Sequence, residues 1–383
     1  MMKRKILVTT GTRAEYGILR PVLKSILQSK KLELYLVVTG THLSKKHGFT
    51  INEIKKDGFK IFKTINMIPK KDTAYFMSKT LGEGIIAFSK IFSQIQPHIN
   101  LVLGDRDEML ASAIAAYHMN IPNAHVHGGD KSGGIDEYNR HAITKISNIH
   151  FAATKKSKNR IIKMGENPKY VFLTGSPSLD EVMNNNITKK TDLEKIYGFQ
   201  FTGNEILLLQ HPVTTEIEHG EKQISNILKA IVNLRITTIA IAPNSDAGNK
   251  KIFDYLKSYS KKYNFIKFYT TLPRRDFLGM LQNCGVFVGN SSSGIIDASY
   301  FRIPVVNIGI RQKGRERGAT IFDVKDITVK SIQNMILKAM KTKRSSFTIG
   351  KNVYGNGNAS KKIVEYLEQI PLNKDLIQKQ IFY

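Results

Sequence analysis

Apolar, β-branched runs alternate with helical patterns along the whole chain, and this alternation restricts the fold more than any other feature. In the first half, strands are expected at residues 5–10, 32–39, 99–104, 123–127, 150–153 and 170–174. In the second half, they are expected at 205–210, 237–242, 265–269, 286–289 and 304–308. Strands that alternate with helices form parallel sheets with crossover helices. The sequence therefore predicts an α/β fold of doubly wound parallel sheets.

The length of the chain predicts two domains in series. Its 383 residues exceed the roughly 250 to 300 residues that one hydrophobic core usually organises. Residues 175–198 hold an SPSLD turn, an Asn run and a Lys-rich stretch, which are typical of a hinge region. We expect a first domain over residues 1–176 and a second that begins at residue 177.

Composition indicates a cytoplasmic protein without a membrane span. No apolar run approaches the roughly 18 residues that a span requires. The basic start is followed by the short run Ile6–Val8, which is more typical of a buried first strand than of a signal peptide. A single cysteine, Cys284, excludes an internal disulfide framework and any Cys-based zinc cluster. A reducing cytoplasm fits this pattern.

The net charge of +27 raises the possibility of a nucleic acid or an anionic membrane as partner. However, the lysines are spread along the chain, and no zinc-finger spacing, aromatic-basic RNA-binding strand or basic heptad region is present. We therefore expect a diffuse solvated surface and no nucleic-acid partner. A positive field would still attract an anionic small molecule.

Polar residues follow the first and third predicted strands, where ligands of open α/β sheets gather. GTRAEYG places Gly11, Arg13 and Glu15 at the start of a helix, where free amides and a guanidinium suit a diphosphate. The alternative is an ordinary turn with an exposed arginine. LGDRDE presents Asp105 beside Arg106, either as a satisfied ion pair or as an acid/base group with the residue that tunes it.

The next strand ends in AHVHGGD, where alternation points His125 and His127 to the same face. Together with Asp130 they could suggest a metal site, but no third His or Cys lies at ligand spacing, so we predict no metal. The helix that follows, in IDEYNRHAITK, begins with acids, including Glu137, which the helix dipole favours even without function. An ion-pair lattice is the alternative interpretation there.

The second half supplies a matching set of strand ends. His211 follows a strand and precedes a proline, and PNSDAGN offers Asn244 and Asp246. GNSSSGIIDA forms an anion cradle from Ser291, Ser292 and helix N-terminal amides, with Asp297 within reach of a ribose. Neither a P-loop nor a dinucleotide fingerprint is present, so a kinase or dehydrogenase has no support and no cofactor is expected.

These motifs, in this order and over roughly residues 5–320, resemble the UDP-N-acetylglucosamine 2-epimerase family. The resemblance extends to IRQKGRERG, which contains Arg311. It implies two Rossmann-like domains of the glycosyltransferase-B type around an interdomain active-site cleft. It also implies that the second domain spans 177–356, and that a C-terminal helix and tail, 357–383, cross back to the first.

GTRAEYG, the HxHGGE-like segment with RHxITK, and GNSSSG resemble the hydrolysing branch of that family, whereas non-hydrolysing members typically read VEAG at the His127 position. Asp130 and Asp297 stand where many relatives have Glu, so their reach is one methylene shorter. The resemblance implies a nucleotide sugar and water as reactants, and a homo-oligomer, either a dimer or a tetramer.

The implied reaction converts UDP-N-acetylglucosamine and water to N-acetylmannosamine and UDP, for sialic-acid-type sugars. One alternative is the same reaction on a UDP- or GDP-linked 2,4-diacetamido-2,4,6-trideoxyglucose, for legionaminic acid; another is a glycosyltransferase of the same architecture. By matching positions in the family, the acid/base groups are Asp105, His127, Glu137 and His211. Substrate contacts are assigned to Arg13, Glu15, Gly17, Arg106, Asn244, Asp246, Ser291, Ser292, Asp297 and Arg311.

Overall fold

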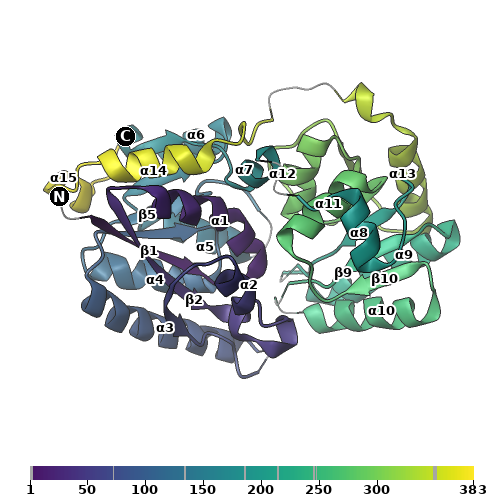
Figure 1. The fold of residues 1–383 in the computed structure, drawn as a ribbon, viewed down its shortest axis with the longest axis horizontal. Helices are drawn as coiled ribbons and strands as arrows, with labels where there is room; N and C mark the ends of the chain where they lie inside the picture. Colours follow the sequence, from purple (N-terminus) through teal and green to yellow (C-terminus); the bar gives the residue numbers. More distant parts are fainter. Residues whose placement is uncertain are drawn as a thin grey trace. The chain divides into compact units, whose positions relative to one another are not determined.

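The protein, seen in a computed structural model, consists of two compact units (Figure 1). The structure describes residues 3–71, 73–132, 135–184, 187–213, 215–244, 246, 248–347 and 352–383. The first unit comprises Met1–Asp130, Asp136–Glu181 and Val353–Tyr383, and the second comprises Lys131–Ile135 and Val182–Asn352.

A parallel sheet of seven strands forms the centre of the first unit, in the order β3-β2-β1-β4-β5-β6-β7. The strands are β1 (Arg4–Thr10), β2 (Leu32–Thr39), β3 (Ile61–Ile65), β4 (Ile99–Leu103), β5 (Asn123–Val126), β6 (Ile149–Ala152) and β7 (Val171–Leu173). The α-helices are α1 (Arg13–Gln28), α2 (Ile51–Lys56), α3 (Ala74–Ile95), α4 (Asp107–His118), α5 (Ile135–Lys145), α6 (Lys155–Lys163), α7 (Ser178–Met183), α14 (Ala359–Gln369) and α15 (Lys374–Ile377). Short 3₁₀ turns lie at Gly40–Leu43, Lys45–His47 and Pro168–Tyr170.

The second unit repeats this plan with a six-stranded parallel sheet, in the order β10-β9-β8-β11-β12-β13. Its strands are β8 (Ile206–Leu209), β9 (Thr238–Ile241), β10 (Ile266–Tyr269), β11 (Val286–Gly289), β12 (Val305–Ile308) and β13 (Ile321–Val324). Its helices are α8 (Lys190–Tyr197), α9 (Ile217–Leu234), α10 (Asn249–Lys262), α11 (Arg274–Asn283), α12 (Ser292–Phe301) and α13 (Val329–Lys341), with a 3₁₀ turn at Arg344–Ser346.

Both sheets reverse their build order at one place, between β1 and β4 in the first unit and between β8 and β11 in the second. In doubly wound sheets, the crevice beyond the carboxyl ends of the strands at such a switch point is the usual ligand site. The loops that follow these four strands are therefore where binding groups are expected in each unit.

The predicted α/β fold with parallel sheets is confirmed, and each of the eleven predicted strands is present to within one residue at either end. Two further strands, β3 and β13, were not predicted. Both lie at the edge of a sheet and are partly exposed, with the sequences IFKTI and IFDV. Partial burial weakens the apolar run that marks the central strands, although the other two edge strands, β7 and β10, were predicted.

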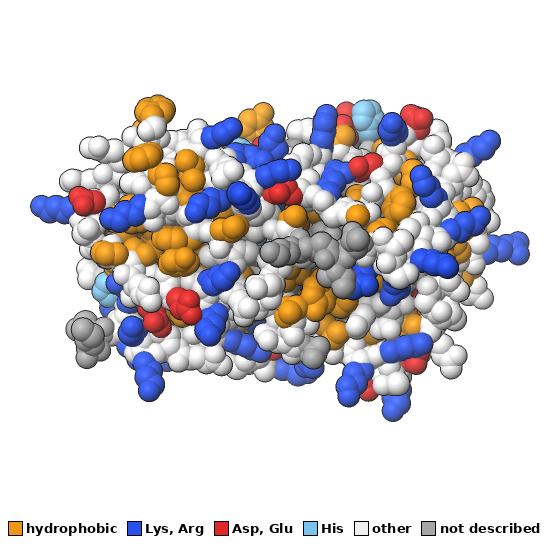
Figure 2. Space-filling view, turned by 90° about the horizontal axis from the view of Figure 1, so that it is seen from above, with side chains coloured by type: hydrophobic (Ala, Val, Ile, Leu, Met, Phe, Trp, Pro, Cys, Tyr) orange, Lys and Arg blue, Asp and Glu red, His pale blue; other side chains and the backbone are white. Residues whose placement is uncertain are grey.

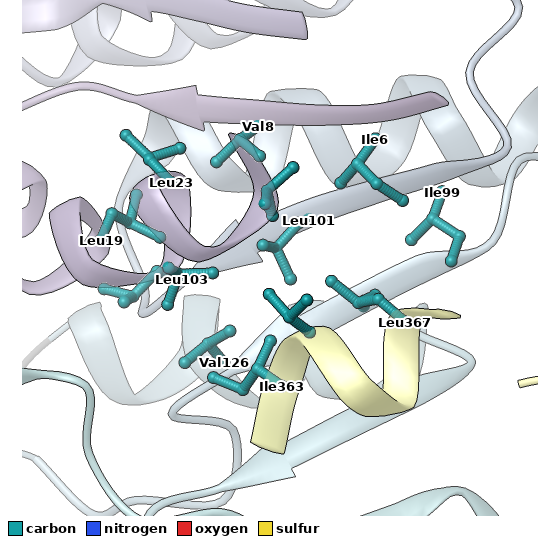
Figure 3. Packing of buried hydrophobic residues seen from close by; sticks show 14 of the residues in the cluster. Ile6, Val8, Leu19, Leu23, Ile99, Leu101, Leu103, Val126, Ile363 and Leu367 are labelled. Atoms are coloured by element: carbon teal, nitrogen blue, oxygen red, sulfur yellow. The ribbon is translucent and has the colours of Figure 1, made fainter. Parts of the chain in front are cut away.

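Leu19 and Leu23 of α1 pack on Ile6 and Val8 of β1 and on neighbouring strands, as Figure 3 shows for the core of the first unit. Ile363 and Leu367 of α14 enter the same core, and α14 lies beside α1 (Figures 1 and 3). The carboxylate of Asp180 accepts the backbone N–H groups of Ala359 (3.0 Å) and Ser360 (2.6 Å), which begin α14. The C-terminal segment is thus an integral layer of the first unit.

On the face seen in Figure 2, lysine and arginine side chains are scattered among polar and apolar ones and do not form a single patch. None of the described helices is long and apolar enough to cross a membrane. The one cysteine, Cys284, is buried, and burial raises the pKa of its thiol to about 12, which keeps it protonated and unreactive.

Candidate functional site

The turn after β1 begins α1 with a capped N-terminus. The side chain of Thr12 accepts the backbone N–H of Glu15 at 3.4 Å, which is the standard use of Thr at this position. Arg13, the first residue of the helix, donates from Nε to Glu53 at 2.9 Å. Its guanidinium therefore lies where a diphosphate was predicted, but an anionic ligand would compete there with a carboxylate. Gly17 is buried within α1.

A second carboxylate, Glu108, lies beside Glu15 and was not predicted from the sequence. Both are buried, and burial, followed by the nearby Glu108 charge, raises the pKa of Glu15 well above its usual range. Arg106 donates from Nε to Glu108 at 3.3 Å. A side chain at Gly11 or Gly40 would collide with the Glu108 carboxyl, with the added Cβ 2.9 and 2.2 Å from its nearest atoms. These glycines leave space for a buried acid.

Asp105 follows β4 and is paired with the buried Arg140 of α5. The side chain of Asp105 is 18% exposed, whereas that of Arg140 is only 4% exposed. Burial alone would lower the pKa of Arg140, but four carboxylates outweigh it and raise that pKa: Asp105, Asp130, Asp136 and Glu137. Arg140 is therefore a fixed cation, and it orients Asp105 at the accessible end of the pair.

His127, at the end of β5, has φ 64°, a left-handed conformation that is uncommon for a residue with a side chain. Its Nδ1 lies 3.2 Å from Oδ2 of Asp130, and its Nε2 lies 2.9 Å from Oγ of Ser176. Its carbonyl oxygen accepts Nη1 of Arg140 at 3.2 Å. Asp105, Arg140, His127 and Asp130 thus form one connected network. Strained backbone of this kind concentrates at functional sites.

The other histidines and acids of this region have different surroundings. His125 is completely buried, contacts the Gly104 carbonyl at 2.7 Å through Nε2, and burial lowers its pKa to about 3. It is therefore a neutral packing residue. Glu137 lies 3.0 Å from His141 on the next turn of α5, with both side chains 28% exposed.

In the second unit, His211 follows β8 and is fixed from two sides. Asn290, at the end of β11, accepts the backbone N–H of His211 (2.7 Å) and donates to its carbonyl oxygen (2.9 Å). The backbone N–H of Asn244 donates to Nδ1 of the ring at 3.0 Å. Because Nδ1 is an acceptor, the neutral ring carries its proton on Nε2. These contacts join the two strands of the switch point.

The predicted anion cradle begins α12. Ser291 is its N-cap and accepts the backbone N–H of Ser293 at 3.4 Å, while Ser292 is the first residue of the helix. Gln312, which was not predicted, donates to the carbonyl oxygen of Asn290 at 2.9 Å. The neighbouring Arg311 is partly exposed. This segment therefore offers a helix N-terminus next to the His211 network, the arrangement that binds phosphate groups.

Asp246 and Asp297 are both engaged by neighbouring side chains. Asp246 accepts from the side-chain amide of Asn244. Asp297 is buried and pairs with both terminal nitrogens of Arg274, at 2.9 and 2.8 Å. Both carboxylate oxygens of Asp297 thus already accept from the Arg274 guanidinium. The contact between Asp297 and a ribose stays a prediction. Within the described part of the chain, no three His, Cys, Asp or Glu side chains are grouped as a metal ion would need.

The chain is similar to known proteins along almost its whole length. Residues 24–368 match the family described as UDP-N-acetylglucosamine 2-epimerase. The hydrolysing UDP-N,N'-diacetylbacillosamine 2-epimerase of Legionella pneumophila is 39% identical over 99% of both chains. The hydrolysing GDP/UDP-N,N'-diacetylbacillosamine 2-epimerase of Campylobacter jejuni is 35% identical over 84% of this chain and 85% of its own.

The fold is also that of solved structures. The structure of UDP-GlcNAc 2-epimerase from Neisseria meningitidis bound to UDP-GlcNAc superposes with a TM-score of 0.81, covering 96% of this chain and 100% of the other at 20% identity. That likeness confirms the expected architecture of two Rossmann-like sheets. The match over residues 24–368 and the identity of 39% over nearly the whole chain show the family. The chain is an enzyme that belongs to the UDP-N-acetylglucosamine 2-epimerase family.

Proposed function

We propose that this enzyme is a hydrolysing 2-epimerase that acts on UDP-linked 2,4-diacetamido-2,4,6-trideoxyglucose and releases UDP and the free 2-epimeric sugar. The network of Asp105, Arg140, His127 and Asp130 at the ends of β4 and β5 is the observation that carries this proposal. The choice of sugar is supported by the similarity, over nearly full length, to relatives named for the diacetamido substrate.

The proposed reaction has two chemical steps, and both require acids and bases. In the first, the bond between C1 and the diphosphate oxygen breaks, its electron pair leaves with UDP, and the C2 proton passes to a base. The sugar that results has a double bond between C1 and C2 and is called a glycal. In the second step, an acid delivers a proton to C2 from the other face, and a base activates the water that adds its oxygen to C1. Each step needs a positioned proton carrier.

Asp105 is the residue of the first unit that we propose touches the sugar. It is partly exposed, and its ion pair with the buried cation of Arg140 orients its carboxylate. Glu137, which is also partly exposed and is bonded to His141, is the second proposed proton carrier. His127 has both ring nitrogens engaged, so its proposed part in proton transfer runs through its hydrogen-bonded partners.

We assign the nucleotide to the groups of the second unit. His211 carries its proton on Nε2 when neutral, which makes that atom a donor suited to a phosphate oxygen. Ser291, Ser292 and the N-terminus of α12 supply further donors, so that charge that accumulates on the leaving diphosphate meets prearranged partners. In this proposal, residues 177–356 form the nucleotide domain, and residues 1–176 with the tail 357–383 form the sugar domain.

The finer features of the assignment are part of the same proposal. We infer a cytoplasmic enzyme, in keeping with its single cysteine, and a homo-oligomer that supplies the precursor of a legionaminic-acid or sialic-acid type sugar. Arg13 and Arg106 would hold the diphosphate after exchanging their carboxylate partners, Glu53 and Glu108, for phosphate oxygens. The proposed contacts also include Glu15, Gly17, Asn244, Asp246 and Arg311.

The substrate is identified by incubating the enzyme separately with UDP-linked diacetamido sugar, its GDP-linked counterpart and UDP-N-acetylglucosamine, and by following free sugar by NMR. The proposal expects release from the UDP-linked diacetamido sugar without an acceptor. Release of sugar from UDP-N-acetylglucosamine alone would show that UDP-N-acetylglucosamine, and not the diacetamido sugar nucleotide, is the substrate. Turnover that requires an added acceptor would instead indicate a glycosyltransferase.

A further inference from the structure

The SPSLD turn has no part in the proposed chemistry, yet it holds a side chain against the active-site network. Ser176 is 1% exposed, and its Oγ lies 2.9 Å from Nε2 of His127. The same Oγ accepts the backbone N–H of Ser178 at 3.3 Å. The backbone N–H of Ser176 donates to the carbonyl oxygen of Tyr354 at 2.7 Å. The hydroxyl is therefore anchored by its own turn and by the returning C-terminal segment.

The direction of each hydrogen bond follows from the chemistry of its partners. A carboxylate only accepts, so Asp130 requires a proton on Nδ1 of His127. In the neutral ring Nε2 is then an acceptor, and the Ser176 hydroxyl must donate to it. Ser176 can do so because its lone pairs remain available to the N–H of Ser178. The arrangement defines a single tautomer of His127.

The far end of this chain of hydrogen bonds is closed as well. The Ser157 hydroxyl donates to Oδ1 of Asp130 at 2.6 Å and accepts from the Thr154 hydroxyl at 2.9 Å. Asp130 is 3% exposed and Ser157 is also 3% exposed, so water does not compete strongly for these bonds. The orientation of the imidazole is thus set from both sides by buried groups.

The backbone of His127 is held just as firmly. Its N–H donates to the carbonyl oxygen of Phe151 at 3.1 Å, and its own carbonyl oxygen accepts from Arg140 at 3.2 Å. The next residues have no space for a larger side chain, since a Cβ at Gly129 would lie 2.5 Å from the carbonyl oxygen of Ser157. The left-handed conformation of His127 is maintained by these contacts.

We propose that Ser176 is a positioning residue of this enzyme: its hydroxyl donates to Nε2 of His127 and holds that imidazole, with its proton on Nδ1, against Asp130. The kinetic part of the proposal rests on the proposed function, whereas the tautomer of His127 is a property of the protein without substrate. Loss of the hydroxyl leaves Nε2 of His127 a buried acceptor without its donor, while Asp130 still holds the proton on Nδ1.

The order Ser176–His127–Asp130 is that of a Ser–His–Asp triad, which suggests a nucleophilic serine as the competing role. Exposure argues against it, because a nucleophile must reach a reacting carbon and Ser176 is 1% exposed. A fluorophosphonate reagent distinguishes the two roles. We expect no labelling of Ser176, and stoichiometric labelling would overturn the positioning role.

The test compares Ser176→Ala with Ser176→Thr and with a matched control, Ser147→Ala. Ser147 is also a buried serine of the first unit, and its hydroxyl donates to the carbonyl oxygen of Ile143 at 2.6 Å. Long-range ¹H–¹⁵N NMR of the histidine rings reports the tautomer of His127, whose signals are assigned by their loss in His127→Gln. We expect the Nδ1-protonated form in the wild type, in Ser176→Thr and in Ser176→Ala, with a changed Nε2 signal in Ser176→Ala alone, because only that variant lacks the hydroxyl donor.

In turnover assays, Ser176→Ala should lower kcat about 5- to 10-fold, the effect of one net hydrogen bond, and leave KM nearly unchanged. Ser176→Thr should restore most of the rate, and Ser147→Ala should have no effect. An unchanged Nε2 signal in Ser176→Ala, or an equal loss of rate in Ser147→Ala, would refute the positioning role. If the wild type releases no sugar from any nucleotide sugar, the proposed function fails, and the NMR comparison still decides the role of Ser176.

Discussion

The Asp297→Asn substitution separates a structural role for this carboxylate from a role in ribose binding. Asp297 of α12 and Arg274 of α11 share two hydrogen bonds, at 2.9 and 2.8 Å, and their side chains are 2% and 9% exposed. Removal of one partner from a buried ion pair costs about 3 to 5 kcal/mol. Because Asn retains one acceptor oxygen, we expect a loss of about 3 kcal/mol, or roughly 6 to 12 °C in Tm for a unit of this size.

Calorimetric unfolding measures the Tm, and titration with UDP measures affinity. The matched control is Glu221→Gln, which removes an exposed ion pair to Lys251 in the same unit and should leave the Tm unchanged. We expect Asp297→Asn to lower the Tm and to bind UDP as the wild type does at a temperature where both are folded. A variant that unfolds like the wild type but binds UDP at least about tenfold more weakly would refute this account and establish the ribose contact.

Three further substitutions test other parts of the account. Asp105→Asn should lower kcat by about two to four orders of magnitude, and the Tm should fall less than in Asp297→Asn, because Arg140 also interacts with other carboxylates; full activity in steady-state assays would exclude Asp105 as a proton carrier. His125 is neutral in the folded protein, with a pKa of about 3, against roughly 6.5 when unfolded. The unfolded chain therefore binds more protons between these two pH values, so the free energy of unfolding falls as the pH is lowered through that window. Urea unfolding at pH 7 and at pH 5 should show a smaller fall for His125→Gln than for the wild type. Ser292→Ala should weaken UDP binding about 2- to 10-fold in titrations without lowering kcat, and an unchanged affinity would remove Ser292 from the cradle.

The central strands could be predicted because burial on both faces requires continuous apolar runs, which are visible in the sequence. The edge strands β3 and β13 escape this rule, since only part of each is buried, although the edge strands β7 and β10 were predicted. Topology adds a second rule: residues that directly follow strands gather at one edge of the sheet. That rule identified Asp105, His127 and His211 as candidates from position alone.

The partners of these residues could not be predicted, because they depend on which helix faces each strand end. Arg140 is one turn along a helix that begins with acids, and its pairing with Asp105 across 35 residues leaves no local signal in the sequence. Ser176 and Arg274 reach their partners through similarly long separations. Glu108 was visible in LGDRDE, but only the structure reveals that its carboxyl fills the space beside Gly11 and Gly40.

Turnover of UDP-linked 2,4-diacetamido-2,4,6-trideoxyglucose in heavy water, with mass and NMR analysis of the released sugar, tests the proposed hydrolysing 2-epimerase reaction itself. Elimination followed by hydration replaces the C2 hydrogen with one from solvent. The free sugar should carry a deuterium at C2, have the inverted configuration there, and appear together with UDP. A released sugar that keeps its original hydrogen and configuration at C2 would contradict the account.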